Sequence, residues 1–157
     1  MSNKPDIIAW CDGSYRGGKK VSKGCNSGGF VIYETATGKE KSYSRLFNRL
    51  TNSRRHGSMV AEFRAVTAAL CQAPKSDHVH IINDNKSVIR ALQSGALSES
   101  TWEKAEHTMH VAFRQAMLAL QCHEHVSFQW KSRNSKMMRK AHNLANDATK
   151  PPKAKAA

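Results

Sequence analysis

The chain lacks closely spaced cysteine pairs and has no long apolar run. Its 157 residues include four cysteines (Cys11, Cys25, Cys71 and Cys122), none of them in a Cys-x-x-Cys pair. This usage is typical of free thiols in a reducing compartment, where structural disulfides are rare. No segment approaches the roughly 18 apolar residues of a membrane span, and the first residues lack the apolar stretch of a secretory signal. We therefore expect a cytoplasmic protein with no membrane partner.

Acidic residues are also scarce. Only 12 Asp and Glu accompany 25 Lys and Arg, which gives a formal net charge of +13. A surface of this sign concentrates polyanions, although the charge could also serve only solubility. The basic residues gather at 16–23, 39–55, 131–140 and in the tail, without a long amphipathic basic helix of the kind that suits a membrane surface. The composition therefore favours a nucleic acid as the partner.

The length suits one domain, which we place at residues 1–150, followed by a disordered basic tail at 151–157. Period-two patterns and β-branched or aromatic runs predict strands at 7–12, 28–33, 40–46, 79–83 and 126–130. Apolar residues at helical spacing predict helices at 58–70, 87–93, 100–120 and 141–149, the third opened by a Ser100-Thr-Trp-Glu103 capping box. The order β-β-β-α-β-α-α-β-α predicts an α/β fold, in which helices cover both faces of a five-stranded mixed sheet.

Four carboxylates stand at the edges of these predicted elements: Asp12, Glu62, Asp84 and Asp147. Each alone would be an ordinary turn residue or surface charge. If the first and fourth strands are neighbours, however, Asp12 and Asp84 meet at one edge, and the helices can bring the other two acids there. Clustered carboxylates repel one another, and a divalent cation relieves the repulsion. Oxygen ligands favour Mg²⁺ or Mn²⁺ over zinc, and two such ions roughly 4 Å apart would hold a phosphodiester for hydrolysis.

The sequence contexts of these acids resemble the ribonuclease H family over about residues 7–150. Five segments carry the resemblance in order: Asp12-Gly13-Ser14, Gly28-Gly29-Phe30, Val-Ala-Glu-Phe-Arg-Ala at 60–65, Asn-Asp-Asn-Lys-Ser-Val at 83–88, and Asn-Leu-Ala-Asn-Asp-Ala at 143–148. The resemblance implies a ribonuclease H-like fold and endonucleolytic cleavage of the RNA strand of an RNA/DNA hybrid. It also implies that Asp12, Glu62, Asp84 and Asp147 hold two Mg²⁺ ions, and that the products carry 5′-phosphate and 3′-hydroxyl ends.

The chain departs from the family at the loop before the last helix. Many members carry a His about ten residues before the final Asp, where this chain has Met137, and His142 is too close to Asp147 to replace it. Arg133 or Lys136 are the candidates to substitute electrostatically. The residues that we expect to contact nucleic acid are Gly13, Ser14, Arg16, Arg54, Arg55, Ser58, Asn85 and Arg133.

Three further expectations concern aromatic, metal-like and oligomeric features. We expect Trp130, on an alternating strand, to belong to the core. The Cys122-His-Glu-His125 run resembles a metal cluster, but four adjacent residues seldom converge on one ion. Nothing in the sequence indicates an oligomer, so we expect a monomer.

Two other functions remain open at this point. The fold supports several phosphodiester chemistries, so a structure-specific DNA nuclease, such as a junction resolvase or an exonuclease, is one alternative. A nucleic-acid-binding module without useful catalysis is the other, although such a module gains nothing from carboxylates that face phosphates.

Overall fold

The structure is a computed structural model that describes residues 4–16, 23–47, 50–51, 57–98 and 107–149. Its sheet begins with an antiparallel meander of β1 (Ile7–Arg16), β2 (Lys23–Glu34) and β3 (Glu40–Leu46). β5 (His78–Asn83) joins β1 in parallel and β6 (His125–Trp130) joins β5 in parallel, so the order is β3-β2-β1-β5-β6. The predicted mixed sheet of five strands is confirmed. A two-residue strand, β4 (Leu50–Thr51), pairs with β2 in addition and was not predicted.

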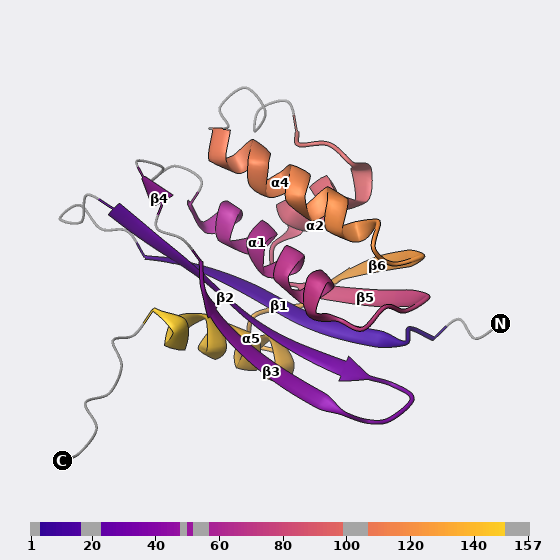
Figure 1. The fold of residues 1–157 in the computed structure, drawn as a ribbon. Coiled ribbons are helices and arrows are strands. Elements are labelled where there is room, and N and C mark those ends of the chain that lie inside the picture. Colours follow the sequence, from indigo (N-terminus) through magenta and orange to yellow (C-terminus); the bar gives the residue numbers. More distant parts are fainter. Residues whose placement is uncertain (1–3, 17–22, 48–49, 52–56, 99–106, 150–157) are drawn as a thin grey trace, which may run out of the picture.

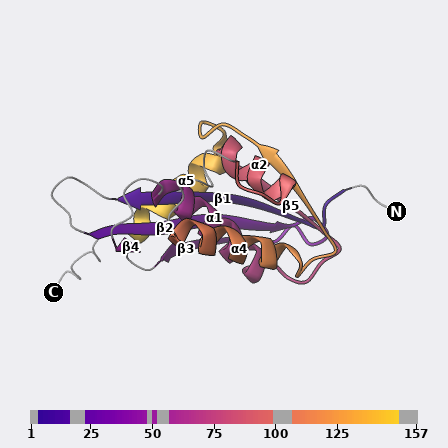
Figure 2. The same cartoon turned by 90° about the horizontal axis from the view of Figure 1, so that it is seen from above.

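Helices cover both faces of this sheet, as predicted. Of the described helices, α1 (Gly57–Gln72), α2 (Lys86–Ser94) and α4 (His107–Leu120) lie on one face, and α5 (Lys136–Ala148) lies on the other (Figure 1). Seen from above, α1 and α4 run along the strands (Figure 2), and they contact each other as well as the sheet. The capping box expected at 100–103 lies outside the described residues. Among the described helices, none is long and apolar enough to cross a membrane.

The core lies between the sheet and the three-helix face. Alternate residues of β1 (Ile7, Ala9 and Cys11) are buried there, and Phe63 of α1 packs edge-on against Phe113 of α4 with their ring centroids 5.6 Å apart. The expectation that Trp130 belongs to this core is wrong, because its side chain is 45% exposed. It is the last residue of the outer strand β6, where its indole N–H donates to the Asp84 carbonyl at 2.9 Å.

Two glycines let helices approach the sheet at the middle of β1. A Cβ atom at Gly13 would collide with the backbone of Ala61 and Glu62, so α1 can lie against β1 only where a side chain is missing. On the other face, a Cβ atom at Gly29 would collide with the α5 backbone at Ala141 and Ala145. Gly29 is paired with Asp12 in the β1–β2 ladder. The two contacts therefore bring one turn of α1 and one turn of α5 beside Asp12 from opposite sides of the sheet.

Candidate active site

Three of the four predicted acids meet at one point. Asp12 on β1, Glu62 on α1 and Asp84 just after β5 each offer a carboxylate oxygen, and these oxygens all lie within 4.8 Å of one another. The parallel pairing of β1 with β5 brings Asp12 and Asp84 to the same end of the sheet, as the crossover predicts. The absence of a side chain at Gly13 admits the turn of α1 that carries Glu62.

The three carboxylates of the trio are buried, and their negative charges repel one another. Asp12 and Glu62 are almost fully inaccessible to solvent, and the side chain of Asp84 is mostly buried. Burial and the neighbouring charge of Asp84 raise the pKa of Asp12, while burial and the charge of Asp12 hold the pKa of Glu62 well above its usual value. One hydrogen bond opposes this for Glu62, because the Asn83 side-chain amide donates to its Oε2 at 2.7 Å.

These residues fit a divalent cation. The Oδ1 atom of Asp12 is buried and has no hydrogen-bond partner, which is costly for a carboxylate oxygen unless a cation balances it. The three donors are oxygens, the ligand type that Mg²⁺ and Mn²⁺ prefer. The trio is the only group of three or more His, Cys, Asp or Glu side chains with metal-ligand spacing among the described residues.

The fourth predicted acid is not part of this group. Asp147 is exposed on α5, and its carboxylate is not among the oxygens of the trio. The buried face of α5 is formed by Met138, Ala141 and Ala145. At 100° per residue, Asp147 lies about 180° around the helix from Met138, which directs it away from the sheet.

His142 occupies the place where a fourth acid was expected. Its Nδ1 atom lies 2.7 Å from Oδ2 of Asp12, on the α5 side of the site. His142 follows Ala141 of the buried face directly, and Asn146 lies one turn further along, so both point toward β1, where they contact Asp12 and Ser14 respectively. Helix phase was the signal in the sequence that could have identified this pair.

A chain of hydrogen bonds supports the imidazole. The Ser14 hydroxyl donates to Oδ1 of Asn146 at 3.0 Å, so the amide nitrogen of Asn146 faces Nε2 of His142, also at 3.0 Å. Assigned from this network, the His142 proton resides on Nδ1 and is donated to Asp12. The predicted nucleic-acid contact Ser14 is thus a support for the site in this structure.

The remaining predicted contacts are distributed around the trio. Arg133 is 58% exposed at its side chain, and its Nε donates to Asp84 Oδ2 at 3.1 Å. Asn85 caps the N-terminus of α2 by accepting from the Val88 backbone N–H at 3.1 Å. Arg16 and Ser58 are exposed at the end of β1 and the start of α1, and Gly13 lies against α1. Arg54 and Arg55 lie outside the described residues.

An exposed aromatic side chain stands beside the acids and was not predicted there. The ring of Trp130 has the ammonium nitrogen of Lys86 at 4.6 Å from its centroid, a cation–π contact. The hydrogen bond from its indole to the Asp84 carbonyl fixes the ring at the edge of the site. Trp130 and Lys86 therefore present an aromatic face and a positive charge next to the carboxylates.

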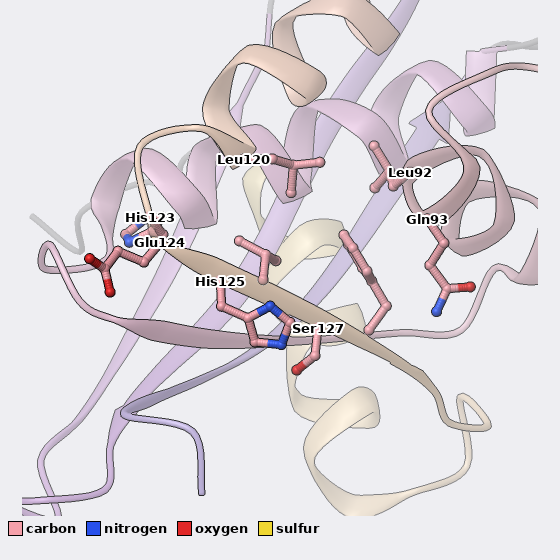
Figure 3. Close-up of a pocket in the computed structure, with 9 residues that line it drawn as sticks. Leu92, Gln93, Leu120, His123, Glu124, His125 and Ser127 are labelled. Atoms are coloured by element: carbon pink, nitrogen blue, oxygen red, sulfur yellow. The ribbon is translucent and has the colours of Figure 1, made fainter. Parts of the chain in front are cut away.

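A separate hollow lies at the outer strand and does not include the trio. It has a volume of about 400 Å³ between β6 and the ends of α2 and α4, with Leu92 and Leu120 on one side and His125 and Ser127 on the strand (Figure 3). Two residues of the Cys122–His125 run make other contacts: a ring nitrogen of His123 lies 2.9 Å from the Leu70 carbonyl oxygen, and the ring of His125 packs on that of His78.

No protein-family model and no curated protein match the chain. Several solved structures match it over most of its length. The N-terminal ribonuclease H domain of a Mycobacterium tuberculosis protein is 19% identical with a TM-score of 0.70, covering 92% of this chain and 98% of that one. Ribonuclease H1 from the halophilic archaeon Halobacterium salinarum is 21% identical with a TM-score of 0.69, covering 90% and 96%. A ribonuclease H1 from compost, solved with an RNA/DNA hybrid, is 22% identical with a TM-score of 0.62, covering 90% and 95%. These likenesses show that the chain has the ribonuclease H fold.

Proposed function

We propose that this chain is a divalent-metal-dependent endonuclease that hydrolyses the RNA strand of RNA/DNA hybrids. The observation that carries the proposal is the buried trio of Asp12, Glu62 and Asp84, with its unpaired Asp12 oxygen, at the interior strands β1 and β5 of a ribonuclease H fold. The net charge of +13 supports a polyanionic substrate. One structural neighbour was solved with an RNA/DNA hybrid, which supports this substrate over others.

The trio would hold the cofactor, Mg²⁺ or Mn²⁺. When bound, such cations supply a nucleophilic water at neutral pH and stabilise charge on the leaving oxygen of a phosphodiester. Asn83 keeps Glu62 oriented, through its 2.7 Å hydrogen bond to Oε2 and a second bond of 2.9 Å to the Cys11 carbonyl. Because Asn83 belongs to β5 and Cys11 to β1, the carboxylate is tied to the two strands that carry the other acids.

The rim of the site would bind and orient the substrate. Arg133 is exposed and sits within 3.1 Å of Asp84, so it can contact a phosphate while staying close to the reaction centre. Trp130 offers a face on which a base or sugar can stack, a contact that single strands and hybrids permit. Met137, which stands where many ribonucleases H carry a loop His, is half-buried on α5 and has no charge. We therefore assign the electrostatic role of that His to Arg133.

Substrate competition tests the proposal. Purified protein is incubated with an RNA/DNA hybrid, the matching RNA duplex, the matching DNA duplex and a branched DNA, each with Mg²⁺, Mn²⁺ or chelator. We expect cleavage of the hybrid's RNA strand alone, and only with a divalent cation. Cleavage of branched or duplex DNA would replace the proposal with a DNA nuclease, and tight binding without cleavage in either metal would replace it with a binding module.

A further inference from the structure

Asp12 has two carboxylate oxygens with different surroundings. Oδ1 is buried without a hydrogen-bond partner, whereas Oδ2 lies 2.7 Å from Nδ1 of His142. His142 is not among the residues of the oxygen trio. The Asp12 carboxylate therefore belongs to the trio and also contacts a nitrogen donor outside it.

We infer that Asp12 and His142 form a second cation position, with one oxygen and one nitrogen donor, that takes a first-row transition-metal dication such as Mn²⁺ in preference to Mg²⁺. The inference rests on the proposed function for its biological setting, but the position is defined by the two side chains themselves.

The spacing of the two atoms suits a shared cation. Donor atoms side by side on an octahedral ion, each at about 2.1 Å, are about 3 Å apart. The 2.7 Å between Nδ1 and Oδ2 is close to that value, so only a small movement would admit the ion. His142 is carried by α5, whose backbone is seated directly on Gly29, and this contact keeps the imidazole near Asp12.

The surrounding hydrogen bonds permit the imidazole to change its tautomer. To bind a cation through Nδ1, His142 must carry its proton on Nε2 and so needs an acceptor there. Rotation of the Asn146 amide by about 180° would present its oxygen to Nε2, and its nitrogen would then donate to the Ser14 hydroxyl, which can accept as well as donate. The proton moves from one ring nitrogen to the other, and no buried polar atom of the network loses its partner. Such an outer partner is what orients metal-binding histidines in general.

The donor set determines the metal preference. Mg²⁺ binds oxygen and seldom accepts imidazole, whereas transition-metal dications accept both. The trio should therefore bind either ion, and the Asp12–His142 position should discriminate between them.

Pulsed electron paramagnetic resonance of the Mn²⁺-loaded protein tests this directly, because nitrogen bound to Mn²⁺ modulates the spin echo. We expect nitrogen modulation in the wild type, its loss in His142→Ala, and its retention in Asn143→Ala, a neighbouring exposed residue of α5. His80→Ala controls for surface imidazoles and should also retain it. A parallel titration should show Mn²⁺ binding at this position at least tenfold tighter than Mg²⁺, with the preference removed in His142→Asp.

The outcomes separate this inference from the proposed function. Wild-type protein without nitrogen modulation, or modulation that persists in His142→Ala, would overturn the inference even if the hybrid is cleaved. Modulation that depends on His142 would support it even if no hybrid is cleaved. The wild-type spectrum needs no variant, so misfolding of His142→Ala cannot obscure the result.

Discussion

Replacing Gly29 with alanine should push α5 away from the sheet and pull His142 away from Asp12. The new Cβ atom would stand 2.7 Å from the Leu144 Cβ and closer still to backbone atoms of Ala141 and Ala145. Carbon atoms normally approach no closer than about 3.5 Å, so the helix must move by about 0.8 Å or more. The clash is with main chain, which cannot rotate aside.

The same contacts give the expected loss of stability and the expected lengthening of the contact between Asp12 and His142. Overpacking of this kind costs about 1–3 kcal/mol of unfolding free energy. A movement of about 0.8 Å would also stretch the 2.7 Å contact between Asp12 and His142 to about 3.5 Å, beyond a hydrogen bond. We therefore expect Gly29→Ala to lose stability in urea denaturation, and to cleave the hybrid at least tenfold more slowly under conditions where it remains folded.

A matched variant isolates the steric effect. The exposed Ser44 on β3 donates its hydroxyl to the Leu144 carbonyl, so Ser44→Ala removes an α5 contact without adding volume. It should cost only about 0.5–1.5 kcal/mol and leave cleavage nearly unchanged. Equal stability and equal cleavage in Gly29→Ala and the wild type would refute the argument that this contact positions the site.

Three further outcomes follow from the site. In chelator, the raised pKa of Glu62 means that the folded state holds its proton more tightly than the unfolded state. The contribution of Glu62 to stability is therefore fully present below its ordinary pKa of about 4.3 and is lost as pH rises from there through the higher folded value. Glu62→Gln should flatten this part of the pH dependence in urea denaturation, and exposed Glu124→Gln should not. Arg133→Ala should cost less than about 1 kcal/mol of stability, since the Arg133 side chain is 58% exposed and water screens its charge, but should lower hybrid affinity and reduce the slope of log K against log salt by about 1 in binding titrations. Trp130→Ala should weaken hybrid binding by about 1–3 kcal/mol while Trp130→Phe keeps most of it, and equal affinities for both variants would exclude stacking.

Local pattern was sufficient to predict the sheet and the trio. The strand, helix, strand order from Ile7 to Asp84 allows β5 to lie beside β1 in parallel, and this pairing brings Asp12 and Asp84 together. The sequence context of Glu62 predicted it as the third acid, and the packing of α1 on Gly13 places it there. β4 has only two residues, too few for any periodic signal.

The hydrophobic pattern of the sequence was not sufficient to predict which way the last helix faces. The predicted start at Ala141 omitted Met138, a buried residue that defines which way α5 faces. Without that phase, Asp147 and His142 could not be told apart by position, and resemblance favoured the acid. Trp130 was misplaced for a related reason, since alternation along a strand does not reveal that the strand is at the edge of the sheet.

Strand-specific cleavage by wild type and Asp84→Asn tests the central claim most directly. The hybrid carries separate labels on its RNA and DNA strands, and single-turnover cleavage is followed with Mg²⁺, Mn²⁺ or chelator. The account predicts metal-dependent cutting of the RNA strand by the wild type, lost in Asp84→Asn while folding and hybrid binding persist. RNA cleavage that continues in chelator, or in Asp84→Asn at the wild-type rate, would contradict it.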